Sequence, residues 1–165
     1  MRKPVVGVMG GSKASESVHA MARELGRLIA QRGWVLLNGG RNQGVMAASA
    51  KGAREAGGLV VGVLPDKSDK RASPDLDVAI MTGLGDGRNL INVLSSDVVI
   101  ACPGALGTLS EIIYALKHQK TVILLAREPD PSLERYARKG QVLVARDPAE
   151  AVTRAAAVLA EQGSA

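Results

Sequence analysis

The chain has 165 residues, a formal net charge of +5 and an apolar fraction of 46%. This length supports one domain with a buried core, so we expect a single Rossmann-like domain over residues 1–165. No apolar run approaches the roughly 18 residues of a membrane span. The start of the chain, Met1 to Val5, leads into no signal peptide, and we therefore expect a cytoplasmic protein with no membrane partner.

The positive charge favours an anionic partner, but the sequence argues against nucleic acid. It has no Lys/Arg run, no Phe, and only one Trp and two Tyr to stack on bases. A small phosphorylated molecule fits better. Cys102 is the only cysteine, which excludes an internal disulfide and a cysteine zinc cluster, and we expect no metal site. We expect Cys102 to be buried, and His19 and His118 to lie on the surface.

Apolar runs and amphipathic segments alternate along the whole chain. The apolar runs predict strands at Pro4–Met9, Trp34–Leu37, Leu59–Leu64, Asp77–Met81, Asp97–Ala101, Thr121–Leu125 and Gln141–Val144. The segments between them predict helices at Ser15–Arg32, Gln43–Ala56, Arg88–Ser96, Leu106–His118, Pro131–Arg138 and Pro148–Ala160. The polar segment Asp66–Leu76 is expected to be an exposed loop.

This alternation predicts an α/β fold, Rossmann-like and doubly wound. We expect a mostly parallel sheet of about seven strands with helices on both faces. The uninterrupted apolar runs Val5–Met9 and Val98–Ala101 are expected at its centre, because central parallel strands are buried on both faces.

Glycine loops follow four of the predicted strands. Gly10-Gly11, Gly39-Gly40, Gly83 to Gly87, and Gly104 to Gly107 all fall at predicted carboxyl ends. In doubly wound sheets the ligand crevice lies at that edge, where the strand order reverses. We therefore expect these loops to surround one site.

The loop after the fifth predicted strand is the strongest candidate for phosphate binding. Gly104 and Gly107 allow a tight turn, and the N–H groups of Leu106 to Thr108 lie at a helix N-terminus, which favours an anion. The Thr108 hydroxyl adds a donor, and Glu111 follows one turn later. The alternative is an ordinary strand-to-helix turn in which Thr108 caps the helix.

Two arginines and two amides complete the candidate set. Arg41 lies in the second glycine loop, and Arg88 could grip a phosphate through two parallel hydrogen bonds. The alternatives are an exposed Arg41 and an Arg88 that pairs with Asp86 or another surface acid. Asn89 and Asn92, on the same predicted helix, could add polar contacts. A nicotinamide cofactor is disfavoured, since the first loop lacks G-x-G-x-x-G and no acidic residue ends the second strand.

The segment Pro103–Glu111 resembles the Pro-Gly-Gly-x-Gly-Thr-x-x-Glu signature of the Lonely Guy superfamily. That superfamily includes enzymes that cleave the N-glycosidic bond of nucleoside 5′-monophosphates, and they pair the signature Glu with an Arg fifteen residues before the signature Pro. Arg88 and Glu111 match this pair, and the resemblance implies that they would be catalytic in a hydrolase. Ala105 and Ser110 depart from the enzyme pattern, which weakens that interpretation.

Other runs resemble a narrower branch, the molybdenum cofactor carrier proteins. They include Gly33–Arg41, Lys51–Gly58, Gly62–Pro65 and Ile91–Ser96. The resemblance implies that the chain binds molybdenum cofactor, a phosphate-bearing molybdopterin with or without molybdate or tungstate. The expected contact residues are Gly10, Gly11, Ser12, Gly39, Gly40, Arg41, Gly83, Gly85, Arg88, Asn89, Pro103, Gly104, Ala105, Leu106, Gly107 and Thr108.

Three functions therefore stand open: a cofactor carrier, which we favour, a phosphoribohydrolase, and a nucleotide-binding module without turnover. The resemblance also implies a homo-oligomer, either a dimer or a tetramer, and exchange with proteins that synthesise or accept the cofactor. The apolar faces of the predicted helices Ser15–Arg32 and Leu106–His118 favour association, although both could simply pack on the sheet.

Overall fold

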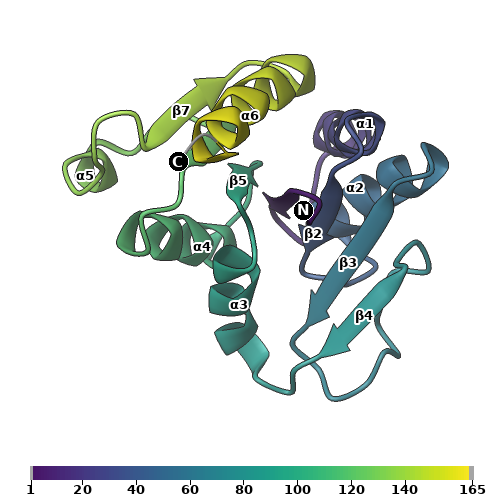
Figure 1. The fold of residues 1–165 in the computed structure, drawn as a ribbon. Coiled ribbons are helices and arrows are strands. Elements are labelled where there is room, and N and C mark those ends of the chain that lie inside the picture. Colours follow the sequence, from purple (N-terminus) through teal and green to yellow (C-terminus); the bar gives the residue numbers. More distant parts are fainter. Residues whose placement is uncertain (1, 164–165) are drawn as a thin grey trace.

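The computed structural model describes residues 2–163, and their strands form one seven-stranded sheet (Figure 1). The strands are β1 (Val5–Met9), β2 (Val35–Asn38), β3 (Leu59–Leu64), β4 (Val78–Met81), β5 (Val98–Ala101), β6 (Val122–Leu125) and β7 (Val142–Ala145). Their order is β4-β3-β2-β1-β5-β6-β7, and every neighbouring pair is parallel. The predicted doubly wound sheet is confirmed, with β1 and β5 adjacent at its centre.

Helices cover both faces of the sheet. On one face, α1 (Glu16–Gln31), α2 (Gly44–Glu55) and α6 (Pro148–Gly163) pack through a core that includes Leu25, Val45 and Val152. On the other face, α3 (Arg88–Leu94) and α4 (Leu106–Lys117) pack through a second core. The single turn α5 (Pro131–Glu134) precedes β7.

Helix α1 shows how local signals set an element's bounds. The Ser15 hydroxyl accepts a hydrogen bond from the Val18 N–H at 3.3 Å, which satisfies a donor at the helix N-terminus. Ala22, Leu25 and Ile29 form its buried stripe. Gly33, with φ of +72°, follows the C-terminus in the left-handed conformation that ends many helices.

The structure differs from the predicted elements mainly at the ends of helices. The glycine loop 83–87 contains a 3₁₀ turn, η1 (Gly85–Gly87), and α5 ends at Glu134 because its sequence supplies a capped first turn but no apolar stripe beyond it.

The connection 66–76 is only partly exposed. Ser73 is buried there, and its N–H donates to the Gly40 carbonyl at 2.8 Å. This contact ties the connection to the loop after β2.

The order of the strands fixes where a ligand crevice can form. From β1 the chain winds outward to β2, β3 and β4, and then returns to place β5 on the other side of β1. The loops after β1 and β5 therefore diverge, and a crevice opens between them at the carboxyl ends of the strands.

Three smaller expectations can be compared with the structure. Cys102 is fully buried, and burial raises the pKa of its thiol to about 12. His19 and His118 are exposed, as expected. Within residues 2–163, no helix is long and apolar enough to cross a membrane.

Two glycines allow α1 and α2 to pack in close contact. A Cβ added at Gly52 would overlap the Arg23 carbonyl, and one added at Gly26 would overlap the Ser49 carbonyl. We predict that Gly52→Ala lowers the unfolding free energy by about 1–3 kcal/mol, although alanine favours helix, because the overlap is with backbone that cannot move alone. Urea denaturation measures this change. Gly107→Ala in α4, where a Cβ meets nothing nearer than 4.0 Å, is the control and should not destabilise.

Candidate functional site

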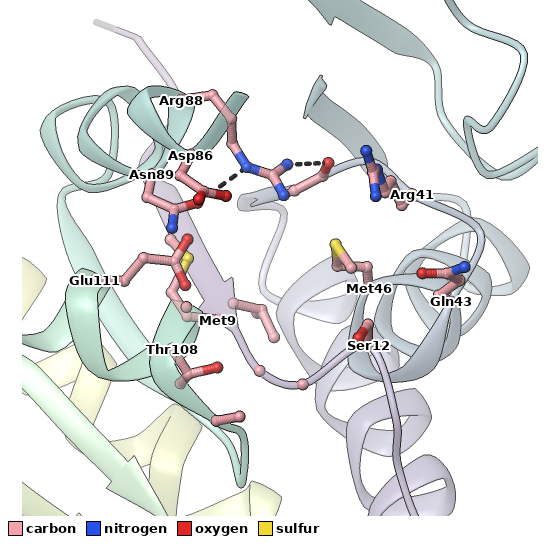
Figure 2. Close-up of a pocket in the computed structure, with 16 residues that line it drawn as sticks. Met9, Ser12, Arg41, Gln43, Met46, Asp86, Arg88, Asn89, Thr108 and Glu111 are labelled. Carbon is pink, nitrogen blue, oxygen red and sulfur yellow. Dashed lines mark hydrogen bonds between the residues drawn. The ribbon is translucent and has the colours of Figure 1, made fainter. Parts of the chain in front are cut away.

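A cavity of about 230 Å³ lies at the predicted crevice (Figure 2). Its walls come from the carboxyl end of β1, the loops after β1 and β2, the first turn of α2, the region around η1, and α4. The lining residues are Val8, Met9, Gly10, Gly11, Ser12, Gly39, Arg41, Gln43, Met46, Asp86, Arg88, Asn89, Ala105, Gly107, Thr108 and Glu111.

The backbone of Gly11 joins the three loops that surround the cavity. Its N–H donates to the Pro103 carbonyl in the loop after β5, and its carbonyl accepts from the Val45 N–H at the start of α2, both at 3.0 Å. Gly44 has a φ of +52°, and a Cβ there would overlap the Gly11 carbonyl. A Cβ at Gly104 would overlap the Thr108 hydroxyl and lie 2.8 Å from the Gly11 nitrogen. These glycines are needed for close packing of the loops.

The N-terminus of α4 offers free N–H groups to the cavity. Its first helical hydrogen bond runs from the Leu109 N–H to the Ala105 carbonyl at 3.0 Å, so the N–H groups of Leu106, Gly107 and Thr108 have no helical acceptor. No side chain caps the helix, and the Thr108 hydroxyl forms no cap to its own helix. Partial positive charge collects at such an end and attracts an anion.

Arg88 enters the cavity wall from the start of α3. Its Nη1 donates to the Gly39 carbonyl and, at 2.7 Å, to the Val63 carbonyl, while Nε donates to the Asn89 side chain at 3.0 Å. The structure shows no ion pair between Arg88 and Asp86. Burial lowers the pKa of Arg88, but not enough to remove its charge. The guanidinium is thus a fixed positive charge held by neutral groups.

Glu111 faces the cavity from the second turn of α4, and only 6% of it is exposed. Its Oε1 accepts a hydrogen bond from Asn92 Nδ2 at 3.0 Å. Burial raises the pKa of the carboxyl to about 7, although the Asn92 hydrogen bond and the charge of Arg88 both lower it. Near neutral pH the side chain is therefore divided between its charged and neutral forms.

Asn89 and Ser110 link α3 to α4. Asn89 accepts from Arg88, as above, and its amide donates to the Ser110 hydroxyl at 3.1 Å. That hydroxyl in turn donates to the Gly107 carbonyl at 2.6 Å. These hydrogen bonds connect the Arg88 side chain, through Asn89 and Ser110, to the first turn of α4, where the free N–H groups lie.

Arg41 lies across the cavity from Glu111 (Figure 2). Its guanidinium pairs with Asp66 at 3.1 Å, and Arg71 pairs with the same carboxylate at 2.9 Å. The alternative of an unpaired, exposed Arg41 is therefore not what the structure shows. Two arginines share one carboxylate, which leaves excess positive charge on this side of the cavity.

The structure brings most of the expected contact residues together. Those that line the cavity are Gly10, Gly11, Ser12, Gly39, Arg41, Arg88, Asn89, Ala105, Gly107 and Thr108, and Glu111, expected as catalytic in a hydrolase, lines it too. Those that do not are Gly40, Gly83, Gly85, Pro103, Gly104 and Leu106. Gly40, for example, donates to the Asn38 side chain and packs against Gly62. These residues shape the loops around the cavity.

Sequence reasoning missed five residues of the wall: Val8, Met9, Gln43, Met46 and Asp86. Met9 is the last residue of β1 and directly precedes Gly10-Gly11. Its position at the carboxyl end of a central strand could have predicted that it lines the cavity. Met46 lies in the first turn of α2, where its apolar side chain reads as core. The two methionines give the cavity a flexible, polarizable apolar surface.

The fold and the site together define a Rossmann-like protein with a cavity at the switch point of its sheet, lined by Arg41, Arg88 and the first turn of α4. The sequence model of the SLOG cluster4 family matches residues 3–152. The chain therefore belongs to this family.

The chain is also similar to proteins of known structure and to a curated relative. The molybdenum cofactor binding protein from Rippkaea orientalis is 48% identical, with a TM-score of 0.89, over 96% of this chain and 99% of its own. A molybdenum cofactor carrier protein from Chlamydomonas reinhardtii is 44% identical, with a TM-score of 0.87, over 96% and 99%. The cytokinin riboside 5′-monophosphate phosphoribohydrolase of Mycobacterium tuberculosis is 36% identical over 68% of this chain and 66% of its own length.

The burial of Glu111 generates a prediction for stability against pH. Its folded pKa of about 7 lies above the ordinary 4.5, so ionisation opposes folding; the penalty is absent below pH 4.5, grows as pH rises, and is complete above about pH 7. Glu111→Gln removes the penalty and keeps an acceptor for Asn92. We expect it to raise the unfolding free energy by about 2–3 kcal/mol at high pH and by little in acid.

Urea denaturation of both proteins at several pH values provides the measurement. The control is Glu128→Gln, which makes the same chemical change at a residue outside the cavity and leaves Glu111 in place. An equal gain from Glu111→Gln in acid and in base would contradict the assignment.

Proposed function

We propose that the chain is a carrier that binds molybdenum cofactor in the switch-point cavity and transfers it. The observation that carries the proposal is the cavity itself, which combines a free helix N-terminus with two arginines in a chain nearly half identical to cofactor-binding proteins along almost all its length. A phosphate-bearing pterin needs both an anion site and an open, glycine-lined wall beside it.

The residues divide into two groups in this proposal. Gly107, Thr108 and the preceding N–H of Leu106 would hold the terminal phosphate at the positive end of α4. Gly10 and Gly39 would bound the space for the pterin, because small residues let a flat ring approach the backbone, and the Met46 side chain would pack against that ring. Arg41 and Arg88 supply the charge that balances an anionic ligand. The molybdenum or tungsten atom would be part of the bound cofactor and not a metal that the protein itself holds.

Phosphoribohydrolase activity is the second candidate, and the presence of both Arg88 and Glu111 in one cavity favours it. Three features weigh against it. Nη1 of Arg88 donates to two backbone carbonyls, Glu111 is partly neutral at pH 7, and Ala105 lies on the cavity wall where the enzyme signature has Gly. A carrier needs enclosure and charge, and no catalytic base.

Association and location also form part of the proposal. The exposed apolar residues of α4, Leu106 (82% exposed) and Ile113 (44%), support a homo-oligomer through this helix, whereas α1 is already covered by α2. We place the protein in the cytoplasm, where exchange with cofactor-synthesis or acceptor proteins would occur.

The function is tested by the ligand that the protein carries. Purified without chelators from cells that make the cofactor, the protein should contain a fluorescent oxidised pterin and about equimolar molybdenum or tungsten. Thr108→Val should reduce the bound pterin by roughly tenfold, because it removes one donor to the phosphate and leaves the size of the side chain unchanged. Ser132→Ala, on α5 far from the cavity, is the matched control. A preparation that binds no pterin when offered the free cofactor would overturn the proposal.

Turnover separates the two candidate functions. We expect no release of adenine from AMP above the rate without protein, and no effect of Glu111→Gln on that background. Adenine release that Glu111→Gln lowers by about 100-fold or more, the scale of a lost acid–base group, would establish the hydrolase instead.

The proposed association has its own test. We expect Leu106→Asp with Ile113→Asp to shift the mass measured by light scattering from an oligomer towards 17.1 kDa, because each charge would be buried at the contact. Val78→Asp, at an exposed apolar residue of the edge strand β4, is the control and should leave the mass unchanged. A monomeric parent protein would contradict association.

A further inference from the structure

Glu111 is the only acidic side chain among residues 2–163 that is buried, yet it forms no ion pair. Arg88 lines the same cavity, but it donates to the Gly39 and Val63 carbonyls instead. A buried carboxylate without an opposite charge in contact is costly, and such a group commonly takes up a proton. The geometry thus leaves Glu111 free to change its protonation state.

Asn92 provides a partner for either state of Glu111. It is fully buried; its Nδ2 donates to Glu111 Oε1 at 3.0 Å, while its Oδ1 has no hydrogen-bond partner among the described residues. The two ends of an amide can exchange by a half-turn of the group. The reversed amide would offer Oδ1 to a protonated Glu111, whose O–H then becomes the donor. The pair can therefore serve a charged and a neutral carboxyl.

We infer that Glu111 is a proton-coupled binding residue: when an anion occupies the cavity, Glu111 is held in its neutral form, and the site takes up a proton with its ligand. This inference rests on the proposed function and deepens it, since it says how the carrier accommodates an acid beside an anionic cargo. It also gives the carrier a means of release, because loss of the proton would place two negative charges together.

The charges around Glu111 support this coupling. The charged groups that face the cavity with it are Arg88 from α3, Asp86 from η1 and Arg41 from the loop after β2. The strands beneath α4, β5 and β6, carry no charged residue. Arg88 favours the carboxylate, whereas burial opposes it more strongly and brings the pKa to about 7. A bound anion opposes the carboxylate further and raises that pKa.

Linkage fixes the direction of the pH dependence. Below pH 7 the free protein already holds the proton, so anion binding takes up little and its affinity is constant. Above pH 7 the free protein is mostly ionised, so each binding event consumes close to one proton. The affinity should then fall by about tenfold per pH unit.

Sulfate is the appropriate probe, because its charge is constant across this range whereas that of inorganic phosphate is not. The dissociation constant is measured by NMR titration from about pH 6 to pH 8.5, in a buffer without competing anions. We expect the parent protein to lose roughly tenfold or more in affinity across the upper part of this range. Glu111→Gln should bind sulfate equally at all pH values, with the affinity that the parent shows in acid.

Asp86→Asn is the matched control, since it removes an exposed acid from the same cavity. It should strengthen sulfate binding by a similar factor throughout and leave the pH step in place. Infrared difference spectra of the parent protein give a second readout that needs no variant. Sulfate binding at about pH 8 should produce the carbonyl band of a protonated carboxyl.

The outcomes separate this inference from the proposed function. Sulfate binding that is independent of pH in the parent, without the carboxyl band, overturns proton coupling and leaves the anion site intact. A step that survives in Glu111→Gln assigns the proton to another group and also overturns it. Failure of sulfate to bind at any pH, in the parent and in Glu111→Gln, removes the anion site itself and the carrier function with it.

Discussion

The cavity depends on the two backbone hydrogen bonds of Gly11. Without them, the loops that follow β1, β2 and β5 would be separate turns at the ends of separate strands. Because the N–H of Gly11 is bound to Pro103 and its carbonyl to Val45, backbone hydrogen bonds link the three loops directly. The same bonds connect the start of α2 to the segment that leads into α4. Glycine at 44 and 104 is therefore a steric requirement of the site and not evidence of ligand contact.

The fold was predictable because its central strands form distinct apolar runs in the sequence. The four residues of β5 are all buried, as are those of β2 and β6, so each reads as an apolar run between polar turns. The edge strand β4 was predicted as well, although most of its residues are exposed. The 3₁₀ turn η1 was not predicted, because it depends on contacts such as the Gly85 N–H with the Pro65 carbonyl, which no local pattern reveals.

The site was predictable at the level of loops and not of atoms. Gly39 and Gly40 are adjacent and chemically identical, yet Gly39 lines the cavity while Gly40 turns with a φ of +76° to pack on Gly62. Nothing in the sequence tells them apart. The spacing of Arg88 and Glu111 likewise placed both at one edge of the sheet, but could not show that Arg88 would bind carbonyls and that Asn92 would be the partner of Glu111.

That last difference shows how one set of residues can serve either catalysis or carriage. A hydrolase needs Glu111 ionised to stabilise a developing positive centre, and a contact with Arg88 would keep it so. Here the contact is replaced by a neutral amide, and the guanidinium is fixed by carbonyl groups and by the link through Asn89 to Ser110. The charge of Arg88 still balances an anion in the cavity, whereas its pull on Glu111 is too weak to overcome burial. The hydrogen-bond partners of Arg88 and Glu111 therefore determine which chemistry these two residues can perform.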